Sequence, residues 1–164
     1  GPYYMDQIDD IKKTIAEQQL DIVPVEGQEL DEEQQTALDD AIAQITDEDI
    51  YNYILEMNPD VKGIFATNGD TTMQALTACE GKDMKDVVIM GYDADQEEID
   101  AMKDGRIAGM IVQNPYGMGY ATVVAEARCV LNMGNEANVN TGYTWVTPDN
   151  IEDRTVQDIL YAEK

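Results

Sequence analysis

Between residues 61 and 146 the apolar residues gather in short runs, and an amphipathic stretch separates each run from the next. The runs predict buried strands over residues 61–67, 87–92, 107–113 and 143–146. The stretches between them predict helices over residues 71–79, 97–103 and 116–133. Short apolar strands that alternate with helices are typical of parallel βα units, whose sheet is covered on both faces. The pattern therefore predicts an α/β fold with an open Rossmann-like parallel sheet flanked by helices.

The first 57 residues have a different pattern, in which helices dominate. Isoleucines at three- and four-residue spacing predict an amphipathic helix over residues 4–18. A short apolar run predicts a strand over residues 20–25, and a long helical tract follows over residues 31–57. Thr46 and Asp49 have the spacing of a capping box, which divides this tract into two helices. No repeat or linker marks a second domain, so we expect residues 1–164 to form a single α/β lobe.

Charge and histidine content exclude several classes of function. The 164 residues carry 34 acidic and 10 basic side chains and no histidine, which gives a net charge of −24. Nucleic-acid binding needs a basic surface that this composition does not supply, so we expect no nucleic-acid partner. Without histidine there is no Ser-His-Asp triad and no HExxH zinc site. We therefore expect no catalytic residue, metal ion or cofactor. Cys79 and Cys129 lack CxxC spacing, and we expect two buried free thiols in preference to a bridge.

Three polar residues directly follow predicted strands. Asn68, Asp93 and Gln113 come after the runs that end near residues 67, 92 and 112. Ligands of open parallel sheets bind beyond the carboxyl ends of the strands, so these side chains are candidates for one ligand site. Two amides and a carboxylate offer donors and acceptors that suit a polyol. The alternative for Asn68 and Asp93 is a helix cap or turn, whereas Gln113 precedes an Asn-Pro pair that already starts a helix.

Around these candidate residues, the sequence resembles a known family. The segments 90–93, 99–107 and 113–119 read MGYD, IDAMKDGRI and QNPYGMG. They resemble the C-terminal lobe of sugar-binding periplasmic proteins of the ribose-binding type, which are the solute-binding proteins of bacterial ABC importers. The resemblance continues upstream in NPDVKGIFATN and downstream in TGYTWVTPDNI. It covers residues 58–151 well and the preceding residues only loosely.

The resemblance implies a two-lobed receptor that closes on a sugar, of which this chain is mainly one lobe. The family's ligand-binding asparagine, aspartate and glutamine fall on Asn68, Asp93 and Gln113. Its sugar-binding arginine falls on Gln7, and its usual Asn-Asp pair is replaced by Asn68 and Gly69. The implied partners are the N-terminal lobe and the membrane subunits of an importer. The implied location is periplasmic or extracellular, in some members with a lipoprotein anchor.

Other interpretations of the sequence are open. The same lobe occurs in the ligand-sensing domains of LacI-type regulators and of histidine kinases. A Rossmann-like enzyme that uses Asp93 as a general base is the catalytic alternative. The helix predicted over residues 116–133 has an apolar face whose family partner is the other lobe. We expect this face either to pair with a second copy of the chain, as a homodimer, or to fold back onto its own lobe.

Overall fold

A computed structural model describes residues 2–136 and 138–160 of the chain. The chain divides into two compact units, Gly1–Val61 and Lys62–Lys164, where the sequence analysis treated it as one lobe. The division falls where the composition changes. Residues 1–61 carry 17 acidic and 2 basic side chains, whereas residues 62–164 carry 17 and 8.

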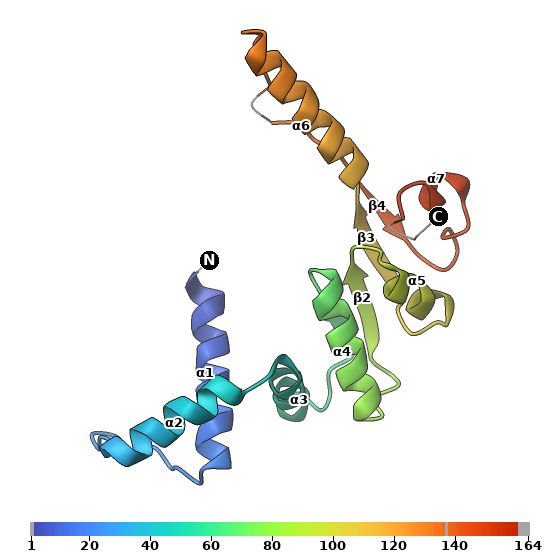
Figure 1. Ribbon diagram of the computed structural model, residues 1–164. Coiled ribbons are helices and arrows are strands. Elements are labelled where there is room, and N and C mark those ends of the chain that lie inside the picture. Colours follow the sequence, from blue (N-terminus) through green and yellow to red (C-terminus); the bar gives the residue numbers. More distant parts are fainter. Residues whose placement is uncertain (1, 137, 161–164) are drawn as a thin grey trace. The chain divides into compact units, whose positions relative to one another are not determined.

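The described part of the first unit is helical. Its elements are α1 (Pro2–Gln19), α2 (Glu32–Gln44) and α3 (Asp47–Met57). Helix α1 packs against both α2 and α3 (Figure 1). A core of buried isoleucines holds the three together, with Ile15 from α1, Ile50 from α3 and Ile45 from the link between α2 and α3. The division of the helical tract is confirmed, because the Thr46 backbone N–H donates to Asp49 Oδ2 at 2.8 Å in a capping box.

The strand predicted over residues 20–25 is wrong. Helix α1 ends in a turn in which the Ile22 N–H donates to the Glu17 carbonyl at 2.9 Å, and Asp21 takes a left-handed φ of +53°. The run then continues as a loop in which Val23 is 80% exposed. A strand needs a partner ladder, and the described residues of this unit form no strand that could supply one. Pro24, which has no N–H, weakens any pairing further.

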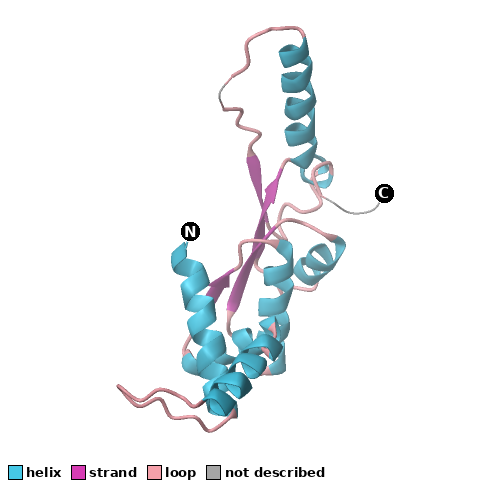
Figure 2. Cartoon of the chain, turned by 60° about the vertical axis from the view of Figure 1, so that its left-hand side comes forward, coloured by secondary structure: helices cyan, strands magenta, loops and turns pink. Residues whose placement is uncertain are grey.

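The second unit is built on a sheet in the order β1-β2-β3-β4 (Figure 2). Its strands are β1 (Gly63–Phe65), β2 (Val88–Tyr92), β3 (Gly109–Gln113) and β4 (Tyr143–Val146). The first three strands are parallel, with Phe65 beside Met90 and Tyr92 beside Ile111. Strand β4 runs antiparallel to β3. The α/β fold predicted from the sequence is confirmed, with one antiparallel edge strand in place of an all-parallel sheet.

Helices cover one face of this sheet. Helix α4 (Gly69–Gly81) packs against β2, and α5 (Gln96–Lys103) packs against α4. On this face the side chains of Ile89, Met110 and Val112 are at most 3% exposed. On the opposite face Phe65 and Val88 are 48% and 51% exposed. The expectation of a sheet buried on both faces therefore holds for only one face of the described unit.

Two helices complete the second unit. Helix α6 (Pro115–Val130) has no buried residue. The helix was expected to continue to residue 133 and to end at Gly134. It ends earlier because Asn132 takes the left-handed conformation that terminates a helix, with a φ of +53°. The short α7 (Arg154–Gln157) was not predicted, because one turn of helix leaves no periodic pattern in the sequence. Among the described residues, no helix has both the length and the apolar character needed to cross a membrane.

Candidate functional site

Two of the three predicted site residues are hydrogen bonded to each other. Asp93 directly follows β2, and Gln113 is the last residue of the neighbouring strand β3. The Gln113 Nε2 donates to Asp93 Oδ1 at 3.1 Å, and both side chains are half-buried. This bond fixes the orientation of the amide, so that its Oε1 remains an acceptor while the carboxylate keeps Oδ2 as an acceptor.

The backbone at Asp93 turns sharply. Its φ is +77°, and its N–H donates to the Ile111 carbonyl at 2.9 Å. Aspartate and asparagine are among the few side chains that adopt this left-handed conformation readily. A non-glycine residue held in this region is a common feature of functional sites. The turn sets the carboxylate at the carboxyl end of the sheet, next to Gln113.

Asn68 has the capping role that was the alternative to ligand binding. It is the N-cap of α4, and its Oδ1 accepts from the Thr71 N–H at 2.9 Å. The cap uses Oδ1, so Nδ2 is the group of this exposed side chain that can donate to a ligand. Phe65, the last residue of β1, pairs with Met90 of β2. Asn68 lies three residues after Phe65, and Asp93 lies three residues after Met90. Asn68 and Asp93 therefore lie at the same edge of the sheet.

Thr72 connects the backbones of the two segments that carry Asn68 and Asp93, and sequence reasoning missed it. Its Oγ1 donates to the Asn68 carbonyl at 2.7 Å and accepts from the Tyr92 N–H at 3.3 Å. The side chain is fully buried against Gly91, where an added Cβ would lie 2.5 Å from Thr72 Cγ2. The signal in the sequence is its place on the buried stripe of α4, three residues before Ala75.

Glu98, in the first turn of α5, was also missed. It is 1% exposed, and burial raises its pKa to about 7. Hydrogen bonding from the Asp95 backbone N–H and from the Thr72 side chain lowers this pKa, whereas the charges of Asp95 and Asp93 raise it. Two signals in the sequence could have identified Glu98. It stands three residues after Asp95, as in a capping box, and it lies one turn before the buried Met102.

The helix start after Gln113 is as expected. Asn114 caps α6 by accepting from the Gly117 N–H at 2.8 Å, and Pro115 is the first residue of the helix. The Asn114 Nδ2 also donates to the Thr141 carbonyl at 3.2 Å. Because Asn114 provides the cap, the side chain of Gln113 is not used by the helix and pairs with Asp93 instead.

The described residues hold no group of three or more histidine, cysteine, aspartate or glutamate side chains that could bind a metal ion. Cys79 and Cys129 are both free, as expected, but only Cys79 is buried, and the expectation that Cys129 is buried too is wrong because it lies on the exposed α6. Burial raises the pKa of the Cys79 thiol, and the neighbouring charge of Glu80 raises it further. Cys79 therefore remains a thiol on the buried face of α4.

The chain is similar to a protein family, to individual proteins and to solved structures. Residues 2–129 match the family described as periplasmic binding protein domain. The ribose import binding protein of Salmonella typhimurium is 35% identical over 66 residues, which are 40% of this chain and 22% of that protein. A carbohydrate transporter solute binding protein from Agrobacterium radiobacter, solved in complex with D-arabinose, is 26% identical. It has a TM-score of 0.64 over 79% of this chain and 50% of its own.

A second solved structure extends the likeness of fold over more of the chain. An ABC transporter solute binding protein from Agrobacterium vitis, with bound D-fucose, covers 93% of this chain with a TM-score of 0.65 at 21% identity. The match spans 62% of that protein, and the match to the ribose import binding protein spans less than a quarter of it. Since the family match covers most of its residues, this chain belongs to the family of periplasmic binding protein domains.

Proposed function

We propose that this chain is a sugar-binding lobe of a solute receptor that serves an ABC importer. The observation that carries the proposal is the hydrogen-bonded pair of Asp93 and Gln113 at the carboxyl end of the sheet, beside Asn68. An aligned carboxylate and amide present acceptors and donors in a fixed arrangement, as the hydroxyl groups of a sugar require. The names of the related proteins, which include ribose and D-arabinose, support this class of ligand.

Binding without turnover suits this arrangement better than catalysis. The bonded partner of Asp93 is an amide, which neither takes nor gives a proton near neutral pH. A general base acts through a proton transfer, and a second group must return that proton to the product. We therefore assign the three polar side chains to recognition of the ligand, and no reaction to the chain.

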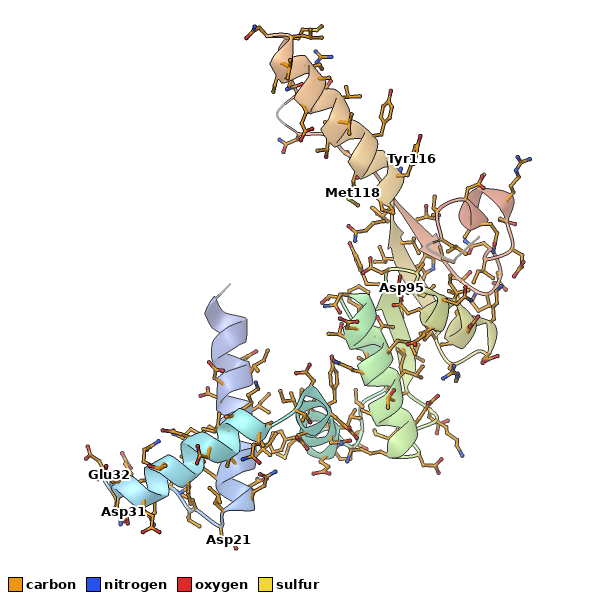
Figure 3. The ribbon with its side chains drawn as sticks, viewed as in Figure 1. Asp21, Asp31, Glu32, Asp95, Tyr116 and Met118 are labelled. Atoms are coloured by element: carbon orange, nitrogen blue, oxygen red, sulfur yellow. The ribbon has the colours of Figure 1, made fainter. Side chains whose placement is uncertain are left out.

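In the intact protein the ligand is enclosed by a second lobe, and the receptor delivers it to the importer's membrane subunits. The apolar side chains of α6 are suited to contact such a partner, because Tyr116, Tyr120 and Val123 are 83%, 65% and 65% exposed. Tyr116 projects from the first turn of α6 (Figure 3). In the isolated chain we expect a second copy to cover this face, as a homodimer. We place the receptor in the periplasm or outside the cell, with a lipoprotein anchor as one form of attachment.

Calorimetric titration with D-ribose, D-arabinose, D-fucose and D-allose tests the proposed function. We expect one of these sugars to bind, and Asp93→Asn and Gln113→Ala each to cost about 1–3 kcal/mol of binding free energy, because each removes a partner of a ligand hydroxyl. Asn is chosen at residue 93 because it tolerates the left-handed backbone. The control is Asp104→Asn, which changes an exposed acid at the far end of α5. Conversion of the sugar, detected by chromatography, would overturn the proposal.

A further inference from the structure

The carboxyl group of Glu98 is buried with one oxygen bonded and one not. Oε2 accepts from the Asp95 backbone N–H at 2.9 Å. Oε1 is buried and makes no hydrogen bond of good geometry, although the Thr72 side chain lies near enough to the carboxyl group to lower its pKa. In the described part of the chain, Glu98 and Thr72 are the polar side chains that are buried, and Thr72 already connects the Asn68 and Asp93 segments. A buried carboxylate with an unsatisfied oxygen is costly, whereas an uncharged carboxyl group is much less so.

This carboxyl group lies between the two backbone segments that carry the site. On one side it approaches Gly69, the residue after Asn68, where an added Cβ would lie 3.3 Å from Oε2 and 3.4 Å from Oε1. On the other side it bonds the N–H of Asp95, two residues after Asp93. Figure 3 shows Asp95 at the start of α5, near the amino end of α4. One side chain therefore accepts a bond from the turn before α5 and lies close to the first residue of α4.

The charged groups around Glu98 are all acidic. Together with Gly69, Glu98 lines a hollow that also includes Asp70 of α4, Asp95 of the turn and Glu97 of α5. Asp93, at the end of β2, adds its charge from the side of the sheet. None of the described residues that line this hollow is basic. When Glu98 ionises, its negative charge is repelled by Asp95 and Asp93, and the described residues that line the hollow offer no cation to pair with it.

We propose that Glu98 is a positioning residue whose uncharged carboxyl group holds the Asn68 and Asp93 segments together, and that its ionisation loosens them. The inference rests on the function proposed for Asn68, Asp93 and Gln113, because it describes how their spacing is maintained. Glu98 itself does not touch the ligand. Protonation of Glu98 is therefore coupled to ligand binding, and the affinity of the site for its ligand falls as the pH rises through neutrality.

The first test needs no sugar. In the full chain labelled with ¹³C and ¹⁵N, the Glu98 carboxyl carbon and the amides of Gly69 and Asp95 are followed by NMR from pH 5 to pH 9. We expect the three signals to titrate with one midpoint near neutrality, and the two amide titrations to vanish in Glu98→Gln. They persist in the control Glu97→Gln, which changes an exposed acid in the same helical turn. A Gly69 amide that does not titrate, or that titrates in Glu98→Gln as in wild type, overturns the inference.

The second test uses the sugar that binds best, measured by calorimetry at pH 5.5 and pH 8.5. We expect binding about tenfold weaker at the higher pH in wild type and in Glu97→Gln, and equal binding at the two pH values in Glu98→Gln. Equal affinity at both pH values in wild type contradicts the proposal. If none of the four sugars binds at either pH, the proposed function fails, and the ligand-free NMR titration still decides whether Glu98 positions the two segments.

Discussion

Replacing Glu98 by glutamine should change how the stability of the second unit depends on pH. The pKa of Glu98 is raised by burial from 4.5 to about 7. Between these values the native state holds a proton that the unfolded state has lost, so the free energy of unfolding decreases as the pH rises. Over this window the loss amounts to roughly 3 kcal/mol, and above pH 7 it is constant. Glutamine keeps the size of the side chain and cannot ionise, so the variant escapes this loss.

Urea unfolding measured between pH 4.5 and pH 8.5 provides the assay. Trp145 is the one tryptophan of the sequence and lies in β4, so its fluorescence reports on the unit that contains Glu98. The difference in unfolding free energy between Glu98→Gln and wild type should grow with pH by up to about 3 kcal/mol, in favour of the variant. The difference in unfolding free energy between Glu97→Gln and wild type should not change with pH. A difference that does not depend on pH in Glu98→Gln would refute the reasoning.

Three further predictions concern packing, capping and association. Gly91→Ala should destabilise the second unit by about 1–3 kcal/mol in the same urea assay, because its Cβ would lie 2.5 Å from Thr72 Cγ2; an unchanged midpoint would contradict the packing. Thr46→Ala should cost about 1 kcal/mol in thermal unfolding followed by circular dichroism, because it removes the cap of α3; an unchanged melting temperature would show that the cap does not stabilise the helix. The double variant Tyr120→Glu and Val123→Glu should convert a dimer to a monomer in sedimentation experiments, and a wild-type chain that is already monomeric at all concentrations would contradict the proposed pairing of α6.

The architecture was predictable because it depends on local patterns. Alternating apolar runs and amphipathic stretches predicted the strands of the second unit and its helices apart from α7, and Thr46 marked the division of the helical tract. The failure at residues 20–25 has a physical reason. An apolar run becomes a strand only where a partner strand is available, and Leu20, Val23 and Pro24 stand in a unit whose described residues form helices and loops but no strand. Pairing of this kind depends on residues far away in the sequence.

The candidate site was predictable only in part. That Asn68, Asp93 and Gln113 lie together could be predicted because the carboxyl ends of parallel strands lie at one edge of the sheet. The bond between Gln113 and Asp93 and the cap made by Asn68 depend on side-chain orientation, which spacing does not determine. Glu98 was harder to find, because a glutamate in the first turn of a helix is usually exposed and stabilises the helix end. Its burial follows from the packing of α5 against α4.

The central claim is that a sugar binds at the edge of the sheet formed by Asn68, Asp93 and Gln113. The most direct measurement is an NMR titration of the ¹⁵N-labelled chain that follows the side-chain amide signals of Asn68 Nδ2 and Gln113 Nε2 as sugar is added. We predict that both signals shift along one saturable curve, whose midpoint equals the dissociation constant from calorimetry. Binding of a sugar that shifts amides elsewhere and leaves these two signals unchanged would contradict this account of the site.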